Sequence, residues 1–251
     1  MRKLAQKMRS ILGLETQPVA VNFYRAQEEL PHEPTPEKLR YCQALMKARQ
    51  GERVLLTAEN LSCPAASAAF GFRPLPEKIS SGEMLVALGL FGRPEAAART
   101  MALMPRLELG AYRAVGLVPL GEAVAVPDVV AVEALPEQLM WVALAYLFDE
   151  GGRLAEVETG VFQATCVDAA VVPYLKQRLN FCLGCYGCRE ASDIGTEETV
   201  LGFPGKDLER VVGALEQLGE KAMVRARAKG IYQQLVRKEE RSSRERSDAE
   251  H

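Results

Sequence analysis

The sequence predicts an α/β protein, with an α+β arrangement as the alternative, made of two related halves that each contain a β-α-β unit. Short apolar runs that suit buried strands alternate with longer amphipathic segments. The order helix, glycine, strand, cysteine, helix occurs twice, and a long amphipathic helix follows the second copy. The length of 251 residues allows one large or two small cores. We therefore expect a single globular domain over residues 1–235, followed by a charged tail over 236–251.

The first half, about residues 15–75, follows a short N-terminal amphipathic helix. Pro36 stands where a helix would begin, because proline at the first helical position gives up no hydrogen bond, and Gly51 would end that helix. Cys63 precedes Pro64 and a run of small residues, so we expect it at a helix start. The expected elements are a helix over 1–14, a strand over 18–23, a helix over 36–50, a strand over 54–57 and a helix over 65–70.

The second half, about residues 125–180, repeats this order. A shift of 100 residues moves Pro36 onto Pro136, and after a further slip of three residues Cys63 falls on Cys166. These matches favour an internal duplication, although the same punctuation also recurs in α/β chains without common descent. The remaining expected elements are helices over 94–104 and 136–150, strands over 117–120, 127–133 and 196–203, a small-residue helix around 169–170 and a long amphipathic helix over 206–235.

The bulk composition argues against several functional classes. A formal net charge of −2 and a pI near 5.9 lack the basic face of a nucleic-acid-binding protein. No apolar run reaches the roughly 20 residues of a membrane helix, and the apolar stretch before Glu15 is too short for a secretion signal. We expect a cytoplasmic protein, in which the six cysteines are free for metals or thiol chemistry. Only His32 and His251 are present, so cysteine and carboxylate side chains must carry any chemistry.

A cysteine-rich loop over residues 180–190 gives the main functional signal. Cys182, Cys185 and Cys188 follow two consecutive C-x2-C spacings, with glycines in the turns between them. Such turns direct successive sulfurs at one point, which suits a zinc ion or an iron–sulfur cluster. A ferredoxin pattern would place the next cysteine where Ser192 stands, so a full set of four ligands must include a cysteine from elsewhere in the chain.

Cys63 and Cys166 are the candidates for remote ligands. Both are expected at helix N-termini, where the positive end of the helix dipole lowers the pKa of a thiol and favours an anionic cluster. Cys182 fits either a ligand or a small buried residue, and Cys42 fits the core side of its helix. The favoured ligand set is Cys63, Cys166, Cys185 and Cys188, with Cys182 as a fifth candidate.

Three neighbouring residues carry weaker signals. Arg189 suits a cation that stabilises a cluster or an anionic ligand, and equally a surface ion pair. Asp168 suits a helix cap better than an acid, and Tyr186 suits packing better than stacking over the sulfurs. No G-x-G-x-x-G follows a strand and no P-loop is present, so a dinucleotide or nucleoside-triphosphate site is not expected.

Several segments of the chain carry a family resemblance. They are P-V-A-V-N-F at 18–23, Y-C-Q-A-L-M-K-A-R-Q-G at 41–51, L-S-C-P-A-A-S-A-A-F-G-F at 61–72, P-D-V-V-A-V at 127–132, G-C-Y-G-C-R at 184–189 and F-P-G at 203–205. Over roughly residues 10–220 the chain resembles the domain-of-unknown-function 169 family, a group labelled uncharacterised archaeal Cys-rich proteins. That family has no assigned reaction.

The resemblance bears on the choice of ligands. It implies that Cys42, Cys63 and Cys185 match recurring family cysteines, and it extends less directly to Cys166 and Cys188. The position of Cys182 resembles a serine position in the family. The resemblance therefore disfavours a literal ferredoxin pattern and implies a ligand set distributed over both halves.

These features together predict an iron–sulfur protein, of the 4Fe-4S type, that works as an electron carrier or a cluster-dependent reductase with a redox partner protein. Four protein ligands would suit electron transfer, whereas three would leave one iron open to a substrate. One alternative is a zinc- or thiol-based binding protein without catalysis. Another is a small-molecule module in which the helix after Cys63 forms a pocket for an anionic or apolar ligand. A homo-oligomer is compatible with the sequence.

Overall fold

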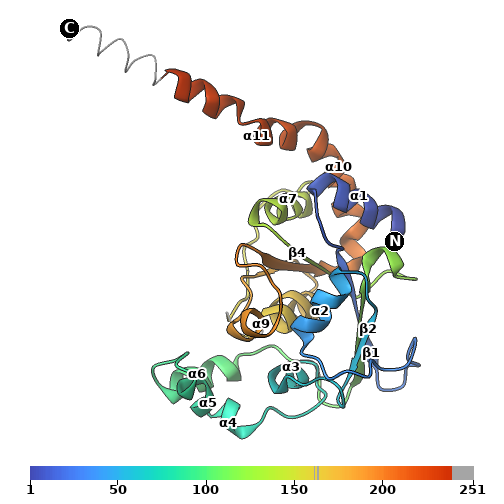
Figure 1. Cartoon of the computed structure of the whole chain (residues 1–251), viewed down its shortest axis with the longest axis vertical. Coiled ribbons are helices and arrows are strands. Elements are labelled where there is room, and N and C mark those ends of the chain that lie inside the picture. The colour runs from blue at the N-terminus through green and yellow to red at the C-terminus, as the bar shows by residue number, and fades with distance from the viewer. Residues whose placement is uncertain (161, 163, 239–251) are drawn as a thin grey trace, which may run out of the picture.

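The computed structural model describes residues 1–160, 162 and 164–238. Its centre is a six-stranded sheet in the order β2-β3-β1-β4-β6-β5, in which every neighbouring pair is antiparallel (Figure 1). Helices pack on this sheet, so the fold is of the α+β type that the sequence predicted as the alternative. The strands are β1 (Val19–Arg25), β2 (Val54–Thr57), β3 (Tyr112–Pro119), β4 (Val129–Ala134), β5 (Asn180–Cys182) and β6 (Thr199–Pro204).

The strand order is symmetric about the central pair of β1 and β4. Exchanging β1 with β4, β2 with β5 and β3 with β6 leaves the order unchanged. In each half the first two strands run in the same direction, and the third strand lies between them and pairs antiparallel with both. Each half is therefore a β-α-β unit that is split by an inserted strand.

Helices cover both faces of the sheet and create two hydrophobic cores. Successive residues of β4 point to opposite sides, as the strand period of two requires: Val129 and Ala131 join the first core, whereas Val130 and Val132 join the second. The first core contains α2 (Tyr41–Arg49), α3 (Pro64–Ala69), α8 (Val172–Lys176) and a π-helix, η2 (Ala164–Val171). The second contains α1 (Arg2–Leu12), α7 (Pro136–Tyr146) and α10 (Leu208–Leu218).

The sequence predicted that the helices opened by Pro36 and Pro136 are equivalent, and the structure shows that this prediction is wrong. Pro136 opens α7, but residues 36–40 form no helix and α2 begins at Tyr41. The two helices also pack on opposite faces of the sheet, because α2 belongs to the first core and α7 to the second. Proline and glycine mark where a helix can begin or end, and they carry no information about the face on which it packs. Both α7 and η2 lie between the first two strands of the second half, but only η2 packs on the same face of the sheet as α2, so η2 is the counterpart of α2.

Two groups of helices extend beyond the sheet (Figure 1). Between α3 and β3 the chain forms a small lobe of α4 (Glu77–Ser80), α5 (Glu83–Ala87) and α6 (Pro94–Ala102), which contact one another. After α10 the chain continues through η4 (Gly219–Met223) and α11 (Val224–Ala228), which point away from the sheet in Figure 1. Most of the predicted charged tail, from residue 239 onward, lies outside the described residues. No helix in the described part of the chain has the length and apolar character to cross a membrane.

The remaining helices are short: η1 (Leu120–Glu122) follows β3, η3 (Gly205–Asp207) follows β6, and α9 (Tyr186–Ala191) lies in the cysteine-rich segment. The segment predicted as a loop over 180–190 contains structure of its own, because it begins with β5 and ends in a helix.

Candidate functional site

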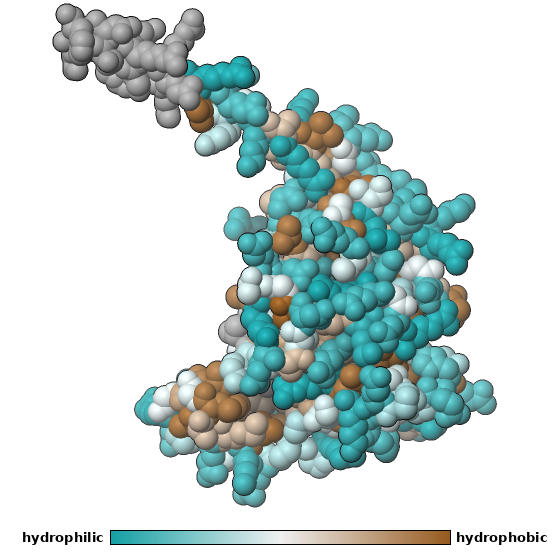
Figure 2. All heavy atoms as spheres, viewed as in Figure 1, coloured by the Kyte–Doolittle hydropathy of each residue, from teal (hydrophilic) through white to brown (hydrophobic). Residues whose placement is uncertain are grey.

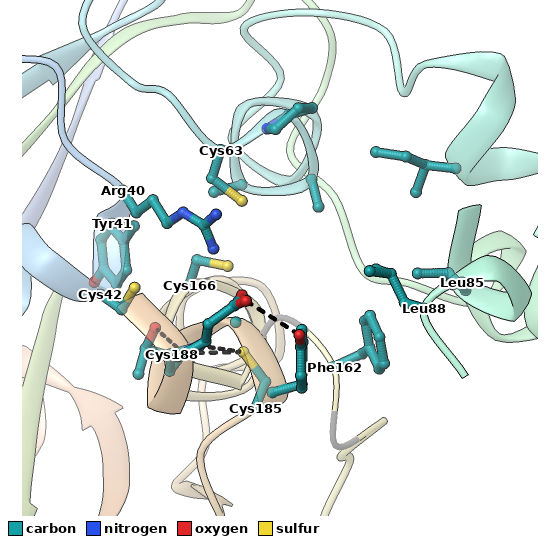
Figure 3. A pocket seen from close by; sticks show the side chains of 18 of the residues that line it. Arg40, Tyr41, Cys42, Cys63, Leu85, Leu88, Phe162, Cys166, Cys185 and Cys188 are labelled. Carbon is teal, nitrogen blue, oxygen red and sulfur yellow. Dashed lines mark hydrogen bonds between the residues drawn. The ribbon is translucent and has the colours of Figure 1, made fainter. Parts of the chain in front are cut away.

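A pocket with a volume of about 260 Å³ lies between the first core and the lobe of α4 to α6. Five of the six cysteines line it, and in Figure 3 their side chains surround one space. The pocket thus collects sulfurs that are spread over most of the sequence. The five are Cys42, Cys63, Cys166, Cys185 and Cys188.

These cysteines come from corresponding places in the two halves. Cys42 lies in the first turn of α2, and Cys166 lies in the π-helix η2, its counterpart. Cys63 precedes α3 after β2, and Cys185 precedes α9 after β5. The strand symmetry therefore pairs Cys42 with Cys166 and Cys63 with Cys185. The pairing of Cys63 with Cys166 predicted from the sequence is therefore wrong, because it matches helices that pack on opposite faces of the sheet.

The closest sulfurs belong to Cys185 and Cys188, whose Sγ atoms lie 3.0 Å apart. The backbone N–H of Cys188 donates to the Sγ of Cys185 at 3.3 Å, which closes the first turn of α9. The Thr165 hydroxyl lies 3.3 Å from the Sγ of Cys188. Hydrogen bonds from Cys185, from Cys42 and from Thr165 lower the pKa of Cys188 below its usual range, against the effect of burial. The same bonds, together with burial, raise the pKa of the Cys42 and Cys185 thiols.

A buried tyrosine and a buried cysteine complete this side of the pocket. Burial raises the pKa of Cys166, and the neighbouring Cys63 raises it further. Tyr41 is 1% exposed, and its hydroxyl has no hydrogen-bond partner among the described residues. A buried donor without an acceptor is rare and costs about 1–3 kcal/mol, so it marks a place where an acceptor is missing.

The opposite wall of the pocket is apolar and comes from different segments. In Figure 3 Leu85, Leu88 and Phe162 face the cysteines across the cavity. Leu88 is 45% exposed and Met84 is 43% exposed, so the wall continues to the surface. Hydrophobic side chains also gather at the surface of the lobe in Figure 2. The pocket therefore has one sulfur-bearing side and one apolar side.

Two residues singled out in the sequence lie apart from this pocket. Cys182 is 1% exposed in β5, where it lies opposite Val200 of β6, and it is not among the residues that line the pocket. Arg189 points its guanidinium at the backbone carbonyls of Leu183, Gly195 and Glu198, to which it donates hydrogen bonds. Arg189 thus fastens the chain segments around α9.

Asp168 has a role different from the one expected, and Tyr186 lies at the pocket. Asp168 caps no α-helix, because it lies inside the π-helix η2, where it accepts a hydrogen bond from the Thr159 hydroxyl. Burial is the main cause that raises the pKa of Asp168 to about 7. Tyr186 lines the pocket, and its hydroxyl donates to Glu190 at 3.1 Å. The π-helix itself is a feature that is frequent at functional sites.

The sequence interpretation missed several residues of the pocket. Arg40 and Tyr41 immediately precede Cys42, so they would have been considered if Cys42 had been assigned to the site. Thr165 precedes Cys166 in the same way. The apolar wall gives no sequence signal, because leucines and a phenylalanine are ordinary residues in any packed lobe.

The described residues contain no group of three or more His, Cys, Asp or Glu side chains placed to hold a metal ion. Cys188 is hydrogen-bonded to Cys42 and Cys185, and the five cysteines as a set line the wall of a cavity. This arrangement differs from a closed tetrahedral zinc site, in which four ligands meet at the ion.

Comparisons with known proteins agree with the resemblance seen in the sequence. No solved structure matches the chain. The chain is 32% identical over 219 residues to the uncharacterized protein MJ0308 of Methanocaldococcus jannaschii, an alignment that covers 86% of this chain and 93% of that relative. Residues 7–214 match the family described as "Uncharacterised ArCR". The chain therefore belongs to the DUF169 family, whose members carry that description.

Proposed function

We propose that the protein binds an iron–sulfur cluster, of the four-iron type, in the cysteine-lined pocket and transfers electrons through it. The observation that carries the proposal is that five cysteines, from both halves of the chain, line a single pocket. Cysteines that only fill space have no reason to meet, because a small apolar side chain packs equally well anywhere in a core. In this chain the one cysteine away from the pocket, Cys182, has the surroundings expected of a packing residue.

The spread of five cysteines around one cavity supports a cluster over a single zinc ion, although the 3.0 Å pair of Cys185 and Cys188 does not distinguish the two. Four sulfurs on one tetrahedral zinc, each about 2.3 Å from the ion, lie roughly 3.8 Å from one another and leave no cavity between them. In a four-iron cluster each cysteine binds a different iron, so the ligands stand around a larger core. A cavity of about 260 Å³ with sulfurs on its wall agrees with the second arrangement.

Five cysteines are available for four ligand positions. The set favoured by the sequence is Cys63, Cys166, Cys185 and Cys188. The strand symmetry favours Cys42 as well, because Cys42 occupies the place in the first half that Cys166 occupies in the second. Cys188 hydrogen-bonds to both Cys42 and Cys185, so either Cys42 or Cys188 serves as the fourth ligand.

Polar groups around the sulfurs suit an anionic cluster. The Tyr41 hydroxyl is buried without an acceptor in the described residues, and a thiolate or sulfide would supply one. The Thr165 hydroxyl already lies at hydrogen-bond distance from Cys188. Hydrogen bonds to cluster sulfurs raise the reduction potential, because they stabilise the additional negative charge of the reduced state.

In the proposed function a reduced one-electron donor protein passes one electron to the site, and an oxidised acceptor takes one electron from it. No covalent bond to the protein forms or breaks in this exchange. The close pair of Cys185 and Cys188, at 3.0 Å, favours a thiol- or zinc-based binding protein as the second candidate function.

The test is to purify the full chain without oxygen and to measure iron, zinc and acid-labile sulfide. We expect about four iron and four sulfide per chain and a broad absorption near 400 nm that weakens on reduction with dithionite. The Cys182→Ser variant is the matched control, since it removes a cysteine without touching the pocket. Colourless protein with stoichiometric zinc would favour the second candidate, and folded protein free of metal would contradict any metal centre.

A further inference from the structure

We infer that the apolar side of the pocket binds a small organic anion, with Arg40 holding its charged group and the lobe of α4 to α6 enclosing its apolar body. The inference deepens the proposed function, on which it rests, because it names the class of molecule that reaches the cysteine site. The residues that support it are Arg40 and the apolar wall, which line the pocket together with the cysteines.

The apolar wall is built for a ligand with an apolar body. Leu85 is 2% exposed and anchors α5 in the first core, whereas Leu88, at the end of α5, is 45% exposed. Phe162 lines the same cavity from a distant segment of the chain. Ligand pockets are mostly apolar with a few polar groups that fix the orientation of the ligand. The volume of about 260 Å³ lies below the roughly 300–1,000 Å³ of pockets for drug-sized ligands, so the ligand is small.

Arg40 supplies a positive charge in this setting. It directly precedes α2, and in Figure 3 its guanidinium points into the pocket. No carboxylate in the described part of the chain forms an ion pair with it, whereas Arg49 of the same helix is paired with Glu198 at 2.9 Å. A guanidinium presents a planar fork of N–H donors that matches a carboxylate in two parallel hydrogen bonds. An unpaired arginine beside an apolar wall therefore selects a molecule with one anionic end.

Among the described residues that line the pocket, Glu190 carries the carboxylate, and it does not take the place of this anion. Glu190 lines the pocket, but its carboxylate accepts a hydrogen bond from the Tyr186 hydroxyl on its own helix. The cysteines offer a competing role for Arg40, since a cation near an anionic cluster also lowers its electrostatic cost. Stabilising a cluster requires only the positive charge of Arg40. Binding the organic anion requires both that charge and the apolar wall.

The test compares hexanoate with 1-hexanol, which share an apolar chain and differ in charge. Binding is measured by ligand-observed NMR titration on the full chain prepared without oxygen, and iron is measured on the same samples. We expect hexanoate to bind more tightly than 1-hexanol. Arg40→Gln should raise the Kd for hexanoate at least tenfold and leave that for 1-hexanol unchanged, and Arg40→Lys should keep part of the preference. Leu88→Ser should raise the Kd for both ligands several-fold.

Arg93→Gln is the matched control, because Arg93 is exposed at the start of α6 and does not line the pocket. Equal binding of the two probes, or an unchanged hexanoate Kd in Arg40→Gln, would overturn the inference. Loss of iron in Arg40→Gln with unchanged hexanoate binding would also overturn it and assign Arg40 to the cluster. Hexanoate binding that depends on Arg40 in protein without iron would support the ligand site and contradict the proposed cluster.

Discussion

The Sγ atoms of Cys185 and Cys188 lie 3.0 Å apart at the start of α9, with the hydroxyl of Thr165 3.3 Å from the second of them. At this separation one sulfur holds the proton that the other accepts. Hydrogen bonds from its neighbours lower the pKa of Cys188, and the hydrogen bond with Cys188 raises the pKa of Cys185. The pair thus presents two closely spaced sulfurs to whatever occupies the pocket.

Oxidation of metal-free protein should join Cys185 and Cys188 first. Treatment with diamide removes two protons and two electrons from the two thiols and forms one S–S bond, while diamide is reduced to its hydrazine. The sulfurs need to move by only about 1 Å to reach the 2.05 Å of a disulfide, and the bond forms when one of them attacks as a thiolate. Peptide mass spectrometry would identify the link, with Cys182 remaining a free thiol. A dominant link between Cys63 and Cys166 would contradict this order of reactivity.

Serine substitutions should separate the ligands from the packing cysteine. We expect Cys185→Ser to lose the most iron, because Cys185 contacts Cys188 and sits at the start of α9. Cys63→Ser and Cys166→Ser should each lose more than half of it, whereas Cys182→Ser should retain it. Iron and sulfide per chain give the readout, and circular dichroism shows that each variant is folded. Retained iron in Cys185→Ser would contradict the proposed ligand set.

Glu133 should make the protein less stable as the pH rises. It lies on β4 at 6% exposure, and neither carboxylate oxygen has a hydrogen-bond partner in the described residues. The guanidinium of Arg49 lies 3.5 Å from the Glu133 carboxylate and 2.9 Å from that of Glu198. Arg49 is therefore paired mainly with Glu198. Burial is therefore the main cause that raises the pKa of Glu133 from 4.5 to about 8. Between these values the folded chain holds a proton that the unfolded chain has lost, so stability falls as the pH rises through this window.

Glu133→Gln should remove that dependence, because glutamine keeps the shape and has no charge to bury. Urea unfolding at pH 5, 6, 7 and 8 would measure it, on wild type and variant in the same metal state. Between pH 5 and pH 8 the free energy of unfolding of the variant, relative to that of wild type, should rise by on the order of 2 kcal/mol. This is expected for a shift of a few pKa units in a buried group. An unchanged slope in the variant would assign the pH dependence to other groups.

Gly202→Ala should disturb both stability and the cysteine site. A Cβ on this residue of β6 would lie 1.9 Å from the carbonyl oxygen of Ala169 in the π-helix η2, which also carries Cys166. The strand and the helix must move apart, at a cost of about 1–3 kcal/mol or more, and bound iron should fall. The matched control is Gly213→Ala in α10, where a Cβ meets nothing within 4 Å. Alanine should there raise the free energy of unfolding by roughly 0.5–1 kcal/mol, because glycine is the poorer helix former. Equal effects on urea unfolding would contradict the close approach of β6 and η2.

The sequence determined the local elements because each depends on residues close along the chain. The apolar run at 18–23 predicted β1, and the run at 127–133 predicted β4, each within about two residues of the observed strand. Pro136 predicted the first residue of α7, since a proline is tolerated at that position and not further along a helix. The cysteine spacing singled out the segment that reaches the pocket, and the motifs predicted the family that the comparisons show. The short strand β5 was missed, because three residues give too little pattern to recognise.

The tertiary structure alone decided which of these elements meet. The antiparallel order, the face on which α2 packs and the meeting of Cys42 with Cys188 depend on hydrogen bonds and contacts between residues far apart along the chain. Local propensity carries no information about such pairs, so it could not distinguish Cys42 in the pocket from Cys182 in the core. Arg40 became part of the site for the same reason, since its role is set by the apolar wall that the lobe of α4 to α6 places opposite it.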